Sequence, residues 1–244
     1  MNIVMPMAGR GSRFSNAGYE IPKPLIPIHG KPMVEWAVKS LNLDGKYIFI
    51  VQRHHIEQYD ADAILKSIIP NCKIVAIDYV TDGQASSILL AEPWIDNSRP
   101  LLCVNCDQVV EWNSAEFLKV CNSWVGNRGM LDGVIPTFEV PVPSTKWSYA
   151  KLDDDEFVID VAEKTPISTH ATSGIYHWLR GENFVAYAKQ MIAQNLRINN
   201  EFYACPVYKE AIDDGLKFKI FDSKVHTTGT PEELDIFLQR LGGI

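Results

Sequence analysis

The sequence predicts an α/β fold in which helices cover both faces of one mixed, mostly parallel sheet. Two observations support this prediction. Short apolar runs typical of buried strands alternate with helical patterns from residue 2 to residue 105, and such alternation favours parallel strands joined by helices. A chain of 244 residues with 46% hydrophobic residues is also long enough to bury one sizeable core. We therefore expect a single domain, residues 1–244, made of a first half (1–112) and a second half (113–244).

The first half begins with an apolar run at residues 2–7, which predicts a buried strand that leads into a glycine-rich loop at 8–12. Further strands are expected at 47–51, 73–78 and 101–105, and helices at 32–43, 56–69 and 84–91. Ligands of such sheets bind beyond the carboxyl ends of the strands. The glycine-rich loop and Asp107 both lie at such strand ends.

The second half has a different pattern, in which several strands follow one another. Helices are expected at 114–124, 182–194, 203–213 and 231–241, and strands at 133–137, 147–152, 157–163 and 171–177. Short polar turns between these strands favour an antiparallel or mixed extension of the sheet.

The charge and hydropathy of the chain exclude some classes of partner. The net charge is −7, whereas a nucleic-acid-binding face needs clustered Lys and Arg, so we expect no nucleic-acid partner. No run of about 18 apolar residues predicts a membrane span, and the N-terminal residues lack the pattern of a secretory signal. We expect a cytoplasmic protein without a membrane partner, and the sequence leaves open whether it forms a homo-oligomer.

The glycine-rich loop and a lysine downstream of it have the properties of a phosphate-binding site. Gly9 and Gly11 permit close backbone approach and turns that point amide groups inward, and Arg13 adds a permanent positive charge. Two nearby glycines are a weak signal by themselves, because many loops contain them for conformational reasons. Prolines on both sides of Lys23 would hold this lysine in a defined direction, although a surface turn gives the same pattern.

Asp107 stands two positions after the end of the apolar strand expected at 101–105. A carboxylate in this position is well placed to bind a hard cation that bridges substrate phosphates. The alternative is an exposed aspartate that caps the next helix.

Several short motifs follow one another along almost the whole chain. They are MPMAGRGSRF (5–14), PKPLI (22–26), GKPM (30–33), VNCDQ (104–108), WSY (147–149), AEK (162–164), TSGIY (172–176) and GTPE (229–232). Their order and spacing resemble the sugar-phosphate nucleotidyltransferases, especially a capsule-associated branch labelled BcbE-like. The resemblance implies the Rossmann-like fold that these enzymes share with GT-A glycosyltransferases. It also implies transfer of a nucleoside monophosphate from a nucleoside triphosphate to a small phosphorylated acceptor, with release of pyrophosphate.

The resemblance assigns the first half of the chain to the nucleotide. The residues expected to bind the nucleotide are Ala8, Gly9, Gly11, Ser12, Gly83 and Gln84. Arg13 and Lys23 would neutralise charge during transfer, and Asp107 would hold Mg²⁺, the expected cofactor. Gln84 would pair with a base edge, although a helix start also suits this residue.

The second half would bind the acceptor. The residues expected there are Tyr149, Glu163, Lys164, Gly174 and Glu201. The Glu163 carboxylate would meet hydroxyl or amine groups and the Lys164 ammonium the acceptor phosphate. Adjacent residues on a strand point to opposite faces, so both reach one ligand only if the backbone twists there or one acts through a neighbour.

Two departures from the family pattern leave details open. Thr227 stands where many members carry an aspartate that is a second metal ligand, so either Asp107 holds the metal with phosphates and water, or a residue such as Glu201 substitutes. Ala150 stands where the family has a glycine, which leaves open whether the acceptor is a sugar phosphate or another small phosphate ester. By resemblance we expect a pyrimidine triphosphate, with CTP favoured, and a role in capsule or surface polysaccharide synthesis.

Two other functions fit parts of this pattern. The first is a GT-A-type glycosyltransferase that uses a nucleotide sugar, but a diphosphate donor does not require the triphosphate cradle formed by residues 9–13 and Lys23. The second is a non-catalytic nucleotide-binding module, which is suggested by Thr227.

Overall fold

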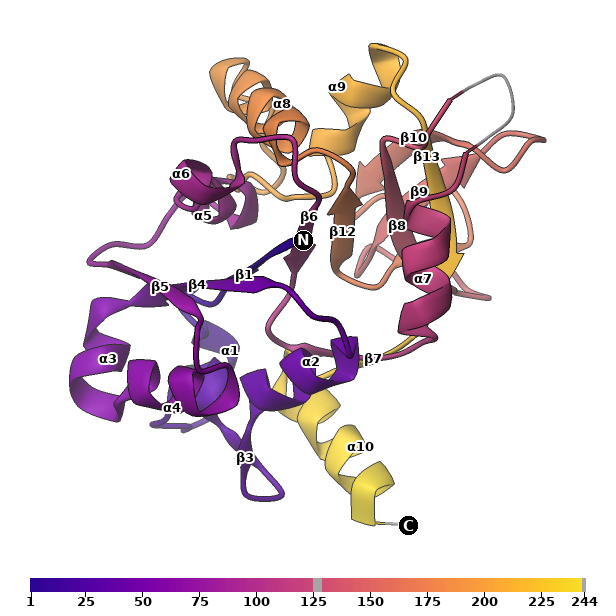
Figure 1. Cartoon of the computed structure of the whole chain (residues 1–244). Coiled ribbons are helices and arrows are strands. Elements are labelled where there is room, and N and C mark those ends of the chain that lie inside the picture. Colours follow the sequence, from indigo (N-terminus) through magenta and orange to yellow (C-terminus); the bar gives the residue numbers. More distant parts are fainter. Residues whose placement is uncertain (125–128, 243–244) are drawn as a thin grey trace.

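The computed structural model describes residues 1–124 and 129–242. Its centre is a ten-stranded sheet built from both halves of the chain (Figure 1). Across the sheet the order is β10 (Val158–Glu163), β9 (Ser148–Leu152), β11 (His170–Thr172), β8 (Gly133–Glu139), β12 (Ile175–Trp178), β6 (Leu101–Val104), β1 (Asn2–Pro6), β4 (Lys46–Gln52) and β5 (Lys73–Ile77), with β13 (Phe218–Asp222) paired to β8. Two small sheets pair β2 (Pro27–Ile28) with β3 (Lys31–Pro32) and β7 (Gln108–Glu111) with β14 (Lys224–Thr227).

The direction of the strands differs between the two halves. β1 is parallel to β4 and β6, and β4 is parallel to β5. β12 runs antiparallel to both β6 and β8 and so joins the parallel strands to the antiparallel ones. The predicted α/β fold with a mixed sheet is therefore confirmed.

Helices cover both faces of the sheet. They are α1 (Ser12–Asn16), the 3₁₀ helix η1 (Lys23–Leu25), α2 (Met33–Leu41), α3 (Arg53–Tyr59), α4 (Ala61–Ile68), α5 (Gln84–Leu89), α6 (Glu92–Ile95), α7 (Ser114–Cys121), α8 (Gly181–Ala193), α9 (Val207–Asp213) and α10 (Pro231–Gly242). Alternate residues of a strand point to opposite faces: Ile3 and Met5 pack with α2, α4 and α7, whereas Val4 packs with α5, α8 and α9. In the described ranges, no helix has the length and apolar character that crossing a membrane requires.

Two expected elements are divided in the structure. The helix expected at 56–69 is two helices, α3 and α4, which meet at Asp60 with a φ of 52°. The strand expected at 171–177 is likewise two strands, β11 and β12, which are separated at Gly174 with a φ of 69°. In both cases a single residue in the left-handed region interrupts an otherwise periodic pattern, and periodicity alone does not reveal this.

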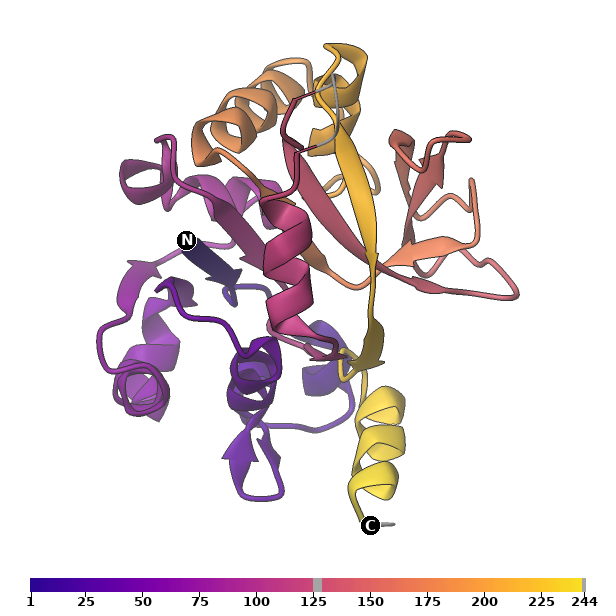
Figure 2. The same ribbon diagram turned by 45° about the vertical axis from the view of Figure 1, so that its right-hand side comes forward.

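The last helix, α10, returns to the first part of the chain. Leu234 and Phe237 pack in a small core with Phe14, Ile28 and Met33. Figures 1 and 2 show α10, in yellow, beside this N-terminal part and away from the antiparallel strands. The start of α10 is thereby brought close to the carboxyl ends of the parallel strands.

Candidate active site

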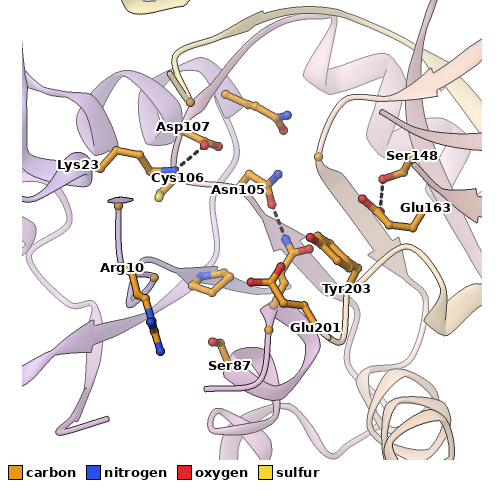
Figure 3. A pocket seen from close by; sticks show the side chains of 18 of the residues that line it. Arg10, Lys23, Ser87, Asn105, Cys106, Asp107, Ser148, Glu163, Glu201 and Tyr203 are labelled. Carbon is orange, nitrogen blue, oxygen red and sulfur yellow. Dashed lines mark hydrogen bonds and ion pairs between the residues drawn. The ribbon is translucent and has the colours of Figure 1, made fainter. Parts of the chain in front are cut away.

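A pocket of about 890 Å³ opens at the carboxyl ends of β1 and β6 (Figure 3). One wall, which we call the nucleotide wall, consists of residues 8–14, Lys23, 80–84 and 105–108. The facing wall, which we call the acceptor wall, consists of residues 145–148, 163–164 and 199–201 with Tyr203. Arg13, Lys23 and Asp107 all line this one pocket.

The loop between β1 and α1 supplies backbone groups and cations. The four loop residues expected to contact the nucleotide all line the pocket: Ala8, Gly9, Gly11 and Ser12. Gly11 has a φ of 61°, which favours glycine, and a Cβ at this position would lie 3.4 Å from the Cβ of Lys23. Arg10 and Arg13 also line the pocket, and neither pairs with a carboxylate among the described residues. Their charges are therefore available to the phosphates of a ligand.

Lys23 and Asp107 form an ion pair on the nucleotide wall of the pocket. The Nζ atom of Lys23 lies 2.6 Å from Oδ2 of Asp107 (Figure 3). Burial lowers the pKa of Lys23, but attraction to Asp107 and Cys106 and the hydrogen bond to Asp107 together outweigh burial, and the pKa rises to about 12. The ammonium group therefore stays charged at neutral pH.

The segment before α10 fixes the backbone at Asp107. The carbonyl oxygen of Asp107 accepts hydrogen bonds from the backbone N–H of Thr228 at 2.8 Å and from its hydroxyl at 3.0 Å. Pairing of β14 with β7 places Thr227 opposite Gln108. Thr227, the position at which the motif resemblance leads us to expect a carboxylate, lines the pocket.

Gly83 and Gln84 join the nucleotide wall to the second half of the chain. Gly83 has a φ of 127°, and a Cβ there would lie 2.5 Å from the backbone nitrogen of Phe202, so the position excludes a side chain. Nε2 of Gln84 donates to Oδ1 of Asn105, and Oε1 of Gln84 accepts from the backbone N–H of Ala204 at 3.3 Å. These bonds occupy the Gln84 amide within the protein, and contact with a base edge stays a prediction.

Glu163 and Lys164 both line the pocket because the chain turns between them. Lys164 has a φ of 56° directly after the end of β10, which is the backbone twist that neighbouring residues need to reach one ligand. Glu163 is only 7% exposed and accepts a hydrogen bond from the Ser148 hydroxyl. Burial raises the pKa of the Glu163 carboxyl. Nζ of Lys164 donates to the Tyr203 hydroxyl and lies 4.4 Å from the centre of its ring.

Gly174 and Glu201 also line the pocket. Gly174 has a φ of 69°, which favours glycine, and a Cβ there would lie 1.5 Å from Oε1 of Gln108, so a side chain would strain the backbone and displace Gln108. Burial and the nearby Glu201 carboxylate raise the pKa of Tyr203, which places Glu201 beside this phenol on the acceptor wall (Figure 3).

Tyr149, the remaining residue expected at the acceptor, does not line the pocket. Its side chain is fully buried. The Tyr149 hydroxyl accepts from the backbone N–H of Ser144 at 2.7 Å and donates to the Ser144 carbonyl at 2.8 Å. Tyr149 therefore anchors the segment that leads to Ser148 rather than facing the cavity.

Several polar residues of the pocket were not selected from the sequence. They are Arg10, Asn105, Lys146, Ser148, Tyr203 and Glu233. Arg10, Asn105 and Ser148 lie inside quoted motifs and could have been found there. Tyr203 was assigned to the expected helix at 203–213, but α9 begins only at Val207. Lys146 has no local signal, because its role depends on Glu233, with which it forms a 2.5 Å ion pair across the pocket.

Oxygen atoms that could bind a hard divalent cation are present at Asp107 and on neighbouring residues of the pocket. Gln108 and Thr227 also line the pocket and carry an amide oxygen and a hydroxyl oxygen. Oε1 of Gln108 is buried and accepts no hydrogen bond from the described residues. Mg²⁺ is commonly held by one or two carboxylates together with substrate phosphates and water. No three His, Cys, Asp or Glu side chains gather into a metal-binding group within the parts of the chain that the structure describes. A cation at Asp107 would therefore complete its coordination with oxygen atoms from water or from the substrate.

Comparisons with known proteins agree with this geometry. Residues 3–119 match the family model of the MobA-like NTP transferase domain. The bifunctional protein GlmU of Methanocaldococcus jannaschii is 26% identical over 181 residues, which are 72% of this chain and 39% of that protein. GlmU of Methanococcus aeolicus is 26% identical over 179 residues, with the same shares of 72% and 39%. The match thus spans well under half the length of these curated relatives.

Solved structures resemble the chain over almost its whole length. A nucleoside-diphosphate-sugar pyrophosphorylase from Vibrio cholerae is 27% identical, with a TM-score of 0.79 over 97% of this chain and 99% of that one. The inositol-1-phosphate CTP transferase of T. maritima, at 14% identity and a TM-score of 0.74 over 99% and 94% of the two chains, shows the fold alone. The domain match and these relatives show that the chain is similar to sugar nucleotidyltransferases, the family that its motifs resemble.

Proposed function

We propose that this protein is a divalent-metal-dependent nucleotidyltransferase. It transfers a nucleoside monophosphate from a nucleoside triphosphate to a small phosphorylated acceptor, such as a sugar phosphate, and releases pyrophosphate. The observation that carries this proposal is the convergence of Arg13, Lys23 and Asp107 on one pocket whose facing wall holds Glu163 and Lys164.

The nucleotide wall is suited to a triphosphate. The backbone of residues 9–12 passes along the pocket, where glycines allow amide groups to approach phosphate oxygens closely. Arg10 and Arg13 add charge that no described carboxylate neutralises. Mg²⁺ held by Asp107 would neutralise further charge on the phosphate oxygens.

The reaction requires positioning and charge rather than covalent help from the protein. An oxygen of the acceptor phosphate attacks the α-phosphorus, the bond from that phosphorus to the bridging β-phosphate oxygen breaks, and pyrophosphate leaves. Negative charge grows on the departing oxygens. Lys23, whose pKa of about 12 keeps it charged, lies in the pocket where it can stabilise this charge.

The acceptor wall is suited to a polar phosphate ester. We assign the Lys164 ammonium to the acceptor phosphate and the Glu163 carboxylate to its hydroxyl or amine groups. Ser148 occupies one oxygen of Glu163, and the other accepts no hydrogen bond from the described residues. The Vibrio cholerae pyrophosphorylase, by its name, acts on nucleoside-diphosphate sugars, which supports a sugar phosphate as acceptor.

Three finer features of the proposal rest on the motif resemblance. The triphosphate is a pyrimidine one, with CTP favoured. The product is a precursor of capsule or surface polysaccharide. The reaction takes place in the cytoplasm.

Pyrophosphate release tests this function. The purified protein is incubated with Mg²⁺, each of CTP, UTP, dTTP, ATP and GTP, and a set of hexose 1-phosphates, amino-sugar 1-phosphates and other phosphate monoesters. We expect pyrophosphate and a nucleoside-diphosphate-linked product with at least one pair, and no release without acceptor. Sugar transfer from a nucleotide sugar without pyrophosphate release would instead establish a glycosyltransferase, and nucleotide binding without turnover would establish a binding module.

A further inference from the structure

Glu233 places a second carboxylate close to Asp107 in the pocket. It lies in the first turn of α10, and hydrophobic packing of Leu234 and Phe237 with Phe14 holds this helix next to the nucleotide wall. Its side chain is 14% exposed and lines the same pocket as Asp107. Glu233 therefore enters the site although it is more than 200 residues away from the glycine-rich loop in sequence.

The carboxylates of Asp107 and Glu233 both lie next to Gly229. A Cβ on Gly229 would lie 2.9 Å from Oδ2 of Asp107 and 3.3 Å from Oε2 of Glu233. Both oxygens thus lie within 3.3 Å of one point. Two carboxylates that share so small a space repel each other unless cations lie between or beside them.

Each of the two acids has a lysine as its partner. Lys23 pairs with Oδ2 of Asp107 at 2.6 Å, and Lys146 pairs with Oε1 of Glu233 at 2.5 Å. The backbone N–H of Gly229 donates to Oε2 of Glu233 at 2.9 Å. This last bond also caps the helix, so Glu233 has a structural role that any test must keep intact.

We propose that Glu233 supplies the carboxylate that is missing at Thr227, and that Asp107 and Glu233 together hold the divalent metal of the metal–triphosphate substrate. This inference rests on the proposed function. Lys146 then competes with the metal for Glu233. Glu201, the substitute considered from the sequence, lies beside Tyr203 on the acceptor wall instead (Figure 3).

Mn²⁺ binding to the protein without nucleotide tests the assignment. Free Mn²⁺ is titrated by electron paramagnetic resonance with the wild-type protein and with Glu233→Gln, in which the amide oxygen can still accept from Gly229. We expect the variant to bind Mn²⁺ at least about tenfold more weakly, because one full charge is lost close to the cation, with an unchanged thermal unfolding midpoint. Glu232→Gln is the matched control, because Glu232 is exposed, adjacent and outside the pocket, and it should bind Mn²⁺ like the wild type.

Lys146→Met gives a result of opposite sign. Removal of the competing ammonium should strengthen Mn²⁺ binding, whereas a purely structural ion pair would leave the affinity unchanged. The assignment is overturned if the wild type binds no Mn²⁺, if Glu233→Gln binds it within about twofold of the wild type, or if Lys146→Met does not bind it more tightly.

The outcome is separable from that of the proposed function. If no triphosphate and acceptor pair releases pyrophosphate while Mn²⁺ binding follows the expected pattern, the transfer activity is wrong and the Glu233 assignment stands. If transfer proceeds and Glu233→Gln binds Mn²⁺ normally, only the Glu233 assignment is wrong.

Discussion

The two walls of the pocket differ in how they present polar groups. The nucleotide wall carries exposed cations, Arg10 and Arg13, which have no described carboxylate partner. The acceptor wall carries a buried carboxylate, Glu163, that a serine hydroxyl holds in place. The first arrangement suits a ligand with high and spread-out negative charge, and the second suits a neutral polar group that must fit in one orientation.

This difference indicates how substitutions on the two walls should act. Groups that meet growing charge at the α-phosphorus affect the chemical step, whereas groups that only hold the acceptor affect its binding. We therefore expect kcat effects from the nucleotide wall and KM effects from the acceptor wall.

The largest effects are expected at the Lys23–Asp107 pair. Lys23→Ala and Asp107→Asn should each lower kcat by about 10²–10³-fold, because each removes a charge that would act on the phosphates in the transition state. Initial rates of pyrophosphate release at saturating substrates measure this change.

Lys31→Ala is the matched control for Lys23. Lys31 is exposed, lies 5.7 Å from the centre of the Trp36 ring and does not line the pocket. The kcat of Lys31→Ala should equal that of the wild type. A near-normal kcat in folded Lys23→Ala would remove Lys23 from the catalytic assignment.

A smaller effect, on KM, is expected at Glu163. Glu163→Gln should raise the KM for the acceptor by about tenfold, corresponding to the loss of one charged hydrogen bond, and should leave the KM for the triphosphate unchanged. Because burial raises the pKa of Glu163, the wild-type carboxylate becomes protonated at a higher pH than an exposed glutamate. The acceptor KM of the wild type should therefore rise as the pH falls through this raised pKa, and that of the variant should not.

Glu139→Gln controls for a general change of charge on the second half, since Glu139 is exposed on β8 and lies outside the pocket. An equal increase in both Michaelis constants of Glu163→Gln would contradict a role confined to the acceptor.

The smallest effect is expected at Tyr149. Tyr149→Phe leaves the N–H and carbonyl groups of Ser144 without their hydroxyl partner and should lower the free energy of unfolding by about 1–3 kcal/mol. Thermal unfolding should show a decrease of a few degrees in Tm. Tyr59→Phe, which removes a solvent-exposed hydrogen bond to the Glu20 carbonyl, should change Tm less. Equal stability of the two variants would mean that Tyr149 does not anchor its segment.

The nucleotide wall could be predicted from sequence because its determinants are local. The apolar run of β1, the glycines after it and the proline-flanked Lys23 lie within one short segment. Asp107 and the glycine-rich loop both follow the carboxyl end of a predicted parallel strand, which indicated that they lie at the same edge of the sheet. The alternation of strands and helices in the first half gave the fold class for the same reason.

The acceptor wall could be predicted only in part, because its contacts join residues that are distant in sequence. Resemblance selected Glu163 and Lys164, but the turn at Lys164 that brings both to the pocket is not visible in the residue types. Tyr149 was expected at the acceptor and is instead buried against Ser144. A side chain's direction depends on packing that periodicity does not specify.

The sequence by itself determined that this chain forms an α/β sheet with a glycine-rich loop after its first strand, because both depend on short-range patterns of apolar and glycine residues. Only the tertiary structure decided which groups face each other across the pocket. The backbone of Phe202 packs directly against Gly83, where a side chain would not fit. Packing of α10 with Phe14 places Glu233 close to Asp107. These contacts depend on how distant segments fit together in space, and no local pattern encodes that fit.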